Sequence, residues 1–240
     1  MDTIDITKCD LKDKKTWDLI CSGHTKGVFQ LETHLGKHWC KEAKPRNIEE
    51  LADVISIIRP GTLKAIEDGK SMTQRYVDRK HNIEETKSLY EPIDKVISRT
   101  YNIIIYQEQA MQIAQVMAGF TESQADTLRK AIGKKKADLM RQVKGEFIEG
   151  CLKEGHTQED ADRIFDIIEK SNRYSFNKSH AVSYALMAYW SAYLKANKKL
   201  EFYLHWLSNA KEKIDPNQEI YELVESAKLD HINVKTPLHE

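Results

Sequence analysis

The stretch IYQEQAMQIAQVMAGF, residues 105–120, sets the pattern for most of this chain. Apolar residues recur in it every three or four positions and fall on one stripe of a helix: Tyr106, Ala110, Ile113 and Met117. Gly119 follows the stripe, and a glycine just after the last helical residue commonly ends a helix. We therefore expect an amphipathic helix here, with this stripe turned towards a core.

Similar helix-starting and helix-ending residues recur towards the C-terminus. Helices are predicted from Thr121 to the glycine at position 133, over residues 136–154, from Thr157 onward, over residues 179–197 and, with a weaker pattern, over 216–229. On the N-terminal side, residues 48–61 indicate a helix ended by Pro60 and Gly61, and residues 28–31 indicate a short strand. The pattern predicts a mainly α fold, an irregular multi-helix domain with a small mixed α/β part at its N-terminal side.

Composition limits the possible classes of protein. The chain has 240 residues, enough for one large domain or two modest ones. Its 37 Lys and Arg residues balance its 37 Asp and Glu residues, so any electrostatic function must be local. The sequence has no long uncharged apolar run and no basic leader, so neither a membrane span nor a secretory signal is predicted. Four cysteines without paired spacing fit reduced thiols, and we expect a cytoplasmic protein.

Candidate metal and catalytic motifs are weak. His34 and His38 stand at i and i+4 close to Cys40, but no second pair of ligands has a matching spacing, so ordinary side chains are favoured over a metal site. Residues 68–71, DGKS, lack the earlier glycine of a phosphate-binding loop, and no nucleophile lies in a recognisable elbow. We predict neither a catalytic residue nor a metal ligand in this chain.

The strongest electrostatic signal lies in residues 129–144, RKAIGKKKADLMRQVK. Seven basic residues stand against a single acid, Asp138: Arg129, Lys130, Lys134, Lys135, Lys136, Arg141 and Lys144. They surround a helix end, a glycine break and the start of the next helix, where unpaired N–H groups attract anions. The segment is either a phosphate-binding site or a solvated charged turn.

A second signal is FNKSHAVSYALMAYW, residues 176–190, in which four consecutive polar residues precede an almost wholly apolar run. We call these four residues, 177–180, the polar knot. A helix that is apolar all round is expected to be buried among others. Asn177 or Ser179 can cap such a helix, but capping does not explain why Lys178 and His180 crowd the same place. The knot is a candidate anion site, with a simple cap plus incidental polar residues as the alternative.

Four segments resemble, in order, the fingers region of the bacterial DNA polymerase III alpha subunit, the C family of DNA polymerases. They are GVFQLET at 27–33, IIRPG at 57–61, residues 101–136 from YNIIIYQEQ to GKKK, and FNKSHAVSYALMAYWSAYLKA at 176–196. The resemblance implies an N-terminal part of the fingers adjoining the palm at 1–100, a helical fingers core at 101–207 and a helical tail at 208–240.

The resemblance also implies site residues by position. Those expected to bind the nucleotide are Arg59, Arg129, Lys130, Asn177, Lys178, Ser179 and His180. Those expected to bind DNA are Lys134, Lys135, Lys136, Arg141 and Lys144. The chain departs from the family at Lys130, where an arginine is usual and bidentate phosphate contact is lost. Asn102 and Ser175 replace usual glycines, and Asn tolerates a positive φ better than Ser does.

The implied function is that of the fingers portion of a replicative, DNA-directed DNA polymerase, a nucleotidyltransferase. Its expected partners are incoming dNTP, primer–template DNA and the palm-containing remainder of the polymerase, with no membrane. The family's catalytic aspartates belong to the palm, so we expect Mg²⁺ to arrive through the palm and the dNTP, no cofactor on this chain alone, and no synthesis by the isolated chain. The alternatives are a polymerase-derived nucleic-acid-binding module without a role in synthesis, and a purely structural helical protein, which the basic patch disfavours.

Overall fold

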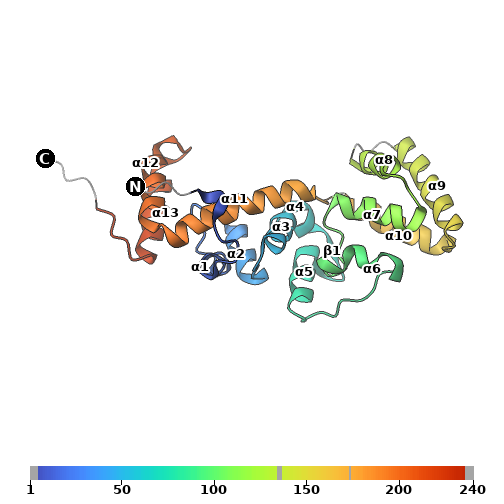
Figure 1. Ribbon diagram of the computed structural model, residues 1–240, viewed down its shortest axis with the longest axis horizontal. Coiled ribbons are helices and arrows are strands. Elements are labelled where there is room, and N and C mark those ends of the chain that lie inside the picture. Colours follow the sequence, from blue (N-terminus) through green and yellow to red (C-terminus); the bar gives the residue numbers. More distant parts are fainter. Residues whose placement is uncertain (1–4, 134–136, 173, 236–240) are drawn as a thin grey trace. The chain divides into compact units, whose positions relative to one another are not determined.

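The computed structural model describes residues 5–133, 137–172 and 174–235. It confirms a mainly α fold with a small mixed part, in which a single two-stranded antiparallel hairpin accompanies the described helices (Figure 1). The α-helices are α1 (Lys14–Ser22), α2 (His34–Ala43), α3 (Ile48–Ile57), α4 (Pro60–Lys64), α5 (Met72–Lys80), α6 (Glu91–Ile97), α7 (Gln107–Ala118), α8 (Glu122–Gly133), α9 (Ala137–Lys153), α10 (Gln158–Asn172), α11 (Lys178–Asn197), α12 (Lys199–Ser208) and α13 (Pro216–Leu229). The hairpin pairs β1 (Ile66–Glu67) with β2 (Lys70–Ser71), and 3₁₀ turns lie at Ile6–Lys8, Ser98–Thr100 and Ala210–Glu212.

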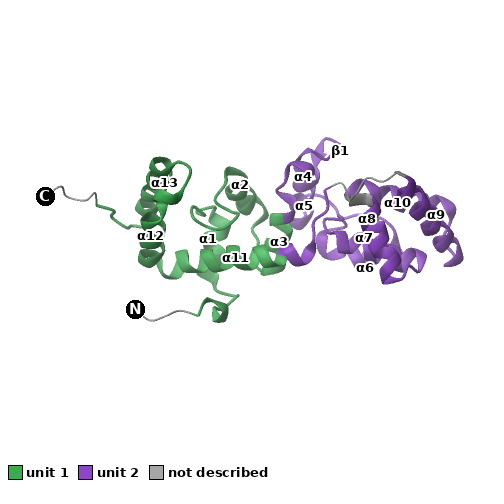
Figure 2. Cartoon of the chain, turned by 90° about the horizontal axis from the view of Figure 1, so that it is seen from above, with its two compact units in different colours: residues 1–55, 182–240 green, residues 56–181 purple. Residues whose placement is uncertain are grey.

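The chain divides into two compact units (Figure 2). Unit 1 combines Met1–Ile55 with Val182–Glu240, and unit 2 is the continuous segment Ser56–Ala181. Helix α11 begins in unit 2 and continues into unit 1. Within the described residues, no helix combines the length and the apolar run that a membrane crossing needs.

The core of unit 2 is built from α6 to α10 and includes the predicted stripe that begins at Tyr106. All four residues of the stripe that begins at Tyr106 are at most 2% exposed. Phe147 of α9 is fully buried between Phe120 and Phe165. Helices α7 and α9 pack closely at Gly150, where a Cβ atom would collide with the backbone of Ala118. A glycine in the middle of a helix is therefore explained here by close backbone approach.

The predicted helix ends of unit 2 are confirmed where the sequence carried local capping signals. The backbone N–H of Gln124 donates to Thr121 Oγ1 at 3.3 Å, and the N–H of Thr121 donates to Gln124 Oε1 at 3.0 Å, which is a capping box. Gly119 ends α7 with a φ of 64°, and Gly155 follows α9 with a φ of 88°. Asn102, in place of a usual glycine, adopts a φ of 56°.

Unit 1 corrects the expectation that the helix over 179–197 is buried on all sides. Its fully buried residues form one stripe of small side chains with a tyrosine and a lysine: Ala181, Ala185, Ala188, Tyr189, Ala192 and Lys195. Met187 is 39% exposed. Alanine brings neighbouring backbones close and so creates a dense core face, whereas the larger apolar residues around the rest of α11 keep contact with solvent.

Two further predictions on the N-terminal side are wrong. The expected strand at 28–31 is a series of turns, because Gly27 and Gln30 adopt positive φ angles of 75° and 63°, which extended chain excludes. The helix predicted over 48–61 ends at Ile57, and Pro60 begins α4 instead of ending α3. A residue before proline avoids the helical region, and proline itself suits the first turn of a new helix.

Candidate nucleic-acid interface

In unit 2, the beginnings of α7 and α11 are tied together by the backbone. The N–H of Gln107 donates to the carbonyl of Phe176, and the N–H of Phe176 donates to the carbonyl of Ile105, both at 2.9 Å. This isolated parallel bridge pairs Tyr106 with Phe176. Because α7 starts at Gln107 and α11 at Lys178, the two positively polarised helix ends lie side by side.

Three cations lie against the two aromatic rings of this bridge. The guanidinium carbon of Arg59 is 3.5 Å from the centroid of the Phe176 ring. Arg99 and Lys178 approach the Tyr106 ring, with Cζ at 5.9 Å and Nζ at 6.0 Å from its centroid. We call these five residues the bridge cluster. Such contacts each contribute about 0.5–1 kcal/mol at exposed sites, and together they hold three positive charges around two helix ends.

The amides at the start of α11 already have acceptors within the chain. Glu108 of α7 accepts from the N–H of Lys178 at 2.9 and 3.1 Å and from Asn177 Nδ2 at 2.8 Å. Asn177 Oδ1 accepts from the N–H of His180 at 2.9 Å and from Ser179 Oγ at 2.7 Å. The predicted cap by Asn177 is therefore confirmed, and a carboxylate occupies the anion-attracting end of the helix. An external phosphate would have to meet the side chains of the bridge cluster rather than these amides.

The polar knot thus has a structural explanation for each of its four residues. Asn177 caps α11, Ser179 supports the cap, and Lys178 belongs to the bridge cluster. The His180 ring lies 5.3 Å from the Phe176 ring, on the bridge itself. Arg59, which the resemblance also assigned to the nucleotide, lies over the ring of Phe176, the residue directly before these four.

Arg129 and Lys130 form a second basic group, on α8. Both pair with Asp126 of the same helix: Arg129 donates from Nε at 2.9 Å and Nη2 at 2.7 Å to Oδ1, and Lys130 Nζ lies 2.6 Å from Oδ2. The hydrogen bonds from Lys130 and Arg129 lower the pKa of the Asp126 carboxyl. The side chains of Arg129 and Lys130 are 38% and 54% exposed, so the group faces solvent.

The residues predicted to bind DNA divide into two kinds. Arg141 pairs with Asp138 on the exposed side of α9. Lys144 instead joins α9 to α10, with Nζ 3.1 Å from Asp166 and 3.3 Å from Asp162. Partial burial opposes the ammonium charge, but the hydrogen bonds to the two aspartates raise the pKa of Lys144 overall. Lys134, Lys135 and Lys136 lie outside the described residues.

Sequence reasoning missed Arg99 and Glu108. Arg99 lies in a 3₁₀ turn that carried no helix signal, and its contact with Tyr106 depends on how that turn packs. Glu108 lies 70 positions before Lys178, and only the backbone bridge brings the two together. No local spacing could have indicated either contact. Glu108 lies within the recognised segment at 101–136, and Arg99 lies just before that segment.

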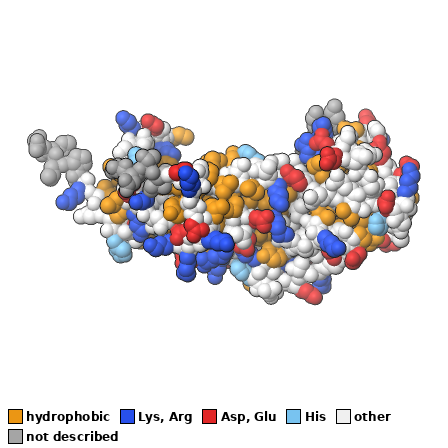
Figure 3. Space-filling view, in the orientation of Figure 1, with side chains coloured by type: hydrophobic (Ala, Val, Ile, Leu, Met, Phe, Trp, Pro, Cys, Tyr) orange, Lys and Arg blue, Asp and Glu red, His pale blue; other side chains and the backbone are white. Residues whose placement is uncertain are grey.

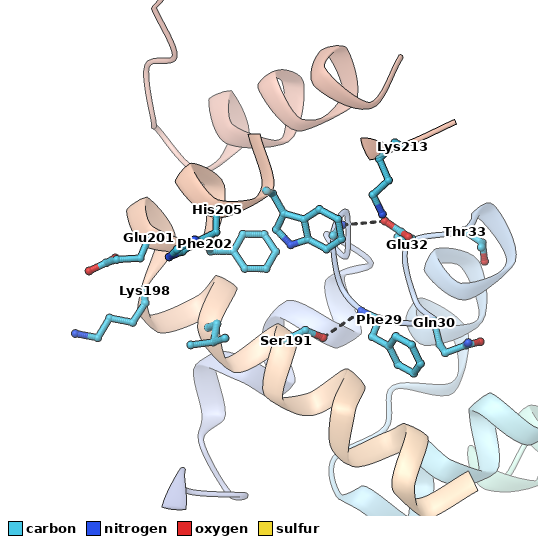
Figure 4. A pocket seen from close by; sticks show the side chains of 13 residues that line it. Phe29, Gln30, Glu32, Thr33, Ser191, Lys198, Glu201, Phe202, His205 and Lys213 are labelled. Carbon is cyan, nitrogen blue, oxygen red and sulfur yellow. Dashed lines mark hydrogen bonds between the residues drawn. The ribbon is translucent and has the colours of Figure 1, made fainter. Parts of the chain in front are cut away.

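A cavity of about 930 Å³ lies within unit 1 (Figure 4). Its lining comes from the turns before α2, from α11 and from α12, and includes Phe29, Phe202 and Trp206. Acidic and basic side chains both border it, among them Glu32, Glu201, Lys198 and Lys213. Such a mixed border does not favour a polyanion. Over the face seen in Figure 3, too, side chains of both charge signs occur.

Among the described residues, no group of three or more His, Cys, Asp and Glu side chains is placed to hold a metal ion. His34, His38 and Cys40 belong to α2. Cys40 is fully buried, and this burial raises the pKa of its thiol to about 12, which disfavours the thiolate that a metal would need.

Comparison with known proteins agrees with the motifs. The model of the bacterial DNA polymerase III alpha subunit finger domain matches residues 1–155. The DNA polymerase III subunit alpha of Aquifex aeolicus is 39% identical over 234 residues, which are 98% of this chain and 19% of that protein. The Escherichia coli K12 subunit is 41% identical over 204 residues, 83% of this chain and 17% of that protein.

The chain therefore spans about a fifth or less of the length of these relatives. The similarity includes all four of the segments quoted above. Arg59 and Lys178 of the bridge cluster, and Arg129 and Lys130 of α8, lie within these segments. From its matched residues and its similarity to these subunits, the chain belongs to the bacterial DNA polymerase III alpha subunit finger domain family.

Proposed function

We propose that this finger domain holds the triphosphate of an incoming dNTP against primer–template DNA during template-directed synthesis. The observation that carries the proposal is the bridge cluster, in which Arg59, Arg99 and Lys178 surround the paired residues Tyr106 and Phe176. Its members come from four separate stretches of unit 2 and meet at two helix ends. A convergence of positive charge of this kind suits a ligand with several negative charges.

The chemistry of nucleotide incorporation requires positive charge to be held in place around the phosphates. Phosphoryl transfer is accelerated mainly by positioning and by neutralising charge on the transferred phosphates. Stacking on Phe176 occupies the face of the Arg59 guanidinium, while its N–H groups lie in the plane and can meet phosphate oxygens. The ring thus fixes the orientation of the group that would bind.

The other predicted residues take supporting places in this proposal. Arg129 and Lys130 on α8 provide a second contact to the triphosphate, and the proposal assigns contacts with the DNA backbone to Lys134, Lys135, Lys136, Arg141 and Lys144. Magnesium belongs to the nucleotide and to the palm of the same polymerase rather than to ligands of this chain. In this scheme the finger domain supplies binding and orientation, and the palm supplies the metal-dependent step.

We expect Arg59→Ala, in a complete polymerase carrying this domain, to lower kcat/KM for nucleotide incorporation by about tenfold to a hundredfold. The estimate corresponds to the loss of one charge-assisted contact, about 1.5–3 kcal/mol. Primer–template affinity should change little. Single-nucleotide incorporation kinetics and DNA titrations on the same preparations measure the two quantities.

Arg163→Ala is the matched control, because Arg163 also stacks on an aromatic ring of unit 2, 5.6 Å from the centroid of Tyr90, but outside the bridge cluster. Incorporation by this variant should remain close to wild type. Equal losses in both variants would contradict the proposal. A loss of DNA affinity with unchanged incorporation would instead favour a nucleic-acid-binding module without a role in synthesis.

A further inference from the structure

Asp126 is the common partner of the two cations on α8. The arginine and the lysine stand three and four positions after it, so all three side chains share one face of the helix. Each carboxylate oxygen takes one cation: Oδ1 accepts both hydrogen bonds from Arg129, and Oδ2 lies 2.6 Å from Lys130. Both oxygens of the Asp126 carboxylate therefore contact the two cations to which we assign phosphate binding.

The contact occupies the edge of the Arg129 guanidinium that a phosphate would use, with both of its donors on Asp126 Oδ1. An arginine that donates from Nε and Nη2 presents the edge with which it binds paired oxygens of carboxylates and phosphates alike. A phosphate could not use the same edge of Arg129 while Asp126 holds it. All three side chains are between 34% and 54% exposed, so an external anion can reach them.

We propose that Asp126 is an internal competitor of phosphate at Arg129 and Lys130, and that a polyphosphate binds there by displacing it. The proposal rests on the proposed function, because it takes these two cations as phosphate ligands. Exposed ion pairs are weak, so a ligand with several charges can replace the carboxylate, whereas a single phosphodiester replaces it less readily. Asp126 would therefore favour triphosphates over the DNA backbone at this group.

A different role for Asp126 predicts the opposite result. If the carboxylate mainly holds the two cations in a binding geometry, its removal should weaken phosphate binding, since two long side chains would have to be ordered by the ligand. If it mainly competes, its removal should strengthen binding. The sign of one measurement separates the two roles.

The experiment compares the 240-residue chain with its Asp126→Asn variant, using inorganic tripolyphosphate as the probe at low ionic strength. We expect the variant to bind tripolyphosphate about threefold to tenfold more tightly in calorimetric titrations, as the release of two exposed ion pairs implies. Glu149→Gln is the matched control: Glu149 pairs with Lys153 at 2.7 Å on the exposed side of α9, and its removal changes net charge equally. Its affinity should stay near the wild-type value.

The outcomes distinguish this inference from the proposed function. Tripolyphosphate binding that is equal or weaker in Asp126→Asn, or that rises as much in Glu149→Gln, overturns the role of Asp126. An Arg129→Ala/Lys130→Ala variant tests the cations themselves, and it should lose most of the binding. If that double variant binds as well as wild type, or if neither wild type nor Asp126→Asn binds, these cations are not phosphate ligands and both proposals fail at this group.

Discussion

Replacing Phe147 by alanine is expected to lower the free energy of unfolding of unit 2 by about 3–5 kcal/mol. Phe147 is fully buried, and its ring centroid lies 5.4 Å from that of Phe165 and 6.0 Å from that of Phe120. Truncation removes the apolar contacts and the aromatic pairs, and it leaves a cavity that the close-packed helices around α9 can fill only in part.

The matched control is Leu152→Ala, which shortens a side chain of the same helix that is 48% exposed. It should cost no more than about 0.5–1 kcal/mol. All four tryptophans belong to unit 1, at positions 17, 39, 190 and 206, so tryptophan fluorescence reports that unit, while far-ultraviolet circular dichroism reports both. Urea titrations followed by circular dichroism should show the large loss for Phe147→Ala. A loss no greater than that of Leu152→Ala would mean that this core is loosely packed.

This core could be predicted because its signals are local. The apolar stripe of α7, the capping box at Thr121 and the glycine after α7 each act within one or two turns of chain. The strand expected at 28–31 failed for a related reason. Val28 and Leu31 are fully buried, as their apolar character suggests, but they are buried from turns. Three apolar residues in a run of four do not distinguish an extended segment from a turn that lies against a core.

Only part of the candidate site could be predicted from the sequence. Its residues around position 178 were found from their unusual polarity and from the resemblance, but the geometry depends on a bridge between residues 106 and 176. Arg99 and Glu108 act through that bridge, so local patterns could not reveal them. The contact of Asp126 with Arg129 and Lys130 is different, because its spacing of three and four residues was visible in the sequence.

Lys195 of α11 is a fully buried lysine, and the sequence alone gave it no role. Its Nζ donates to the carbonyl of Lys26 and to Ser226 Oγ, both at 2.9 Å. Burial lowers the pKa of Lys195 to about 7, against a usual value of 10.5. A neutral amine has two N–H donors, which these two acceptors satisfy, so the uncharged form fits the site without an orphaned donor.

The pKa of Lys195 makes the stability of unit 1 depend on pH. Below pH 7 the amine is protonated in both the folded and the unfolded chain, and the cost of burying its charge is fully present. Between pH 7 and 10.5 the unfolded chain binds more protons, so the free energy of unfolding rises with pH. A pKa difference of about 3.5 corresponds to about 5 kcal/mol in total, of which about 1.6 kcal/mol should appear between pH 7 and 8.5.

Urea titrations followed by tryptophan fluorescence at pH 7, 7.5, 8 and 8.5 measure this rise. Unfolded thiols, whose usual pKa is about 8.5–9, also titrate towards the upper end of this window, and the wild-type chain and its lysine variants carry the same cysteines. Lys195→Met should remove most of the pH dependence, whatever its effect on stability at a single pH, because it removes the titrating group. Lys228→Met, the same substitution at a lysine on α13 that is 62% exposed, should keep the full rise. A wild-type chain whose unit 1 has the same stability at pH 7 and 8.5, or a Lys195→Met variant with an unchanged slope, would mean that the ammonium stays charged against the rings of Phe202 and Tyr203, 5.8 and 5.5 Å away.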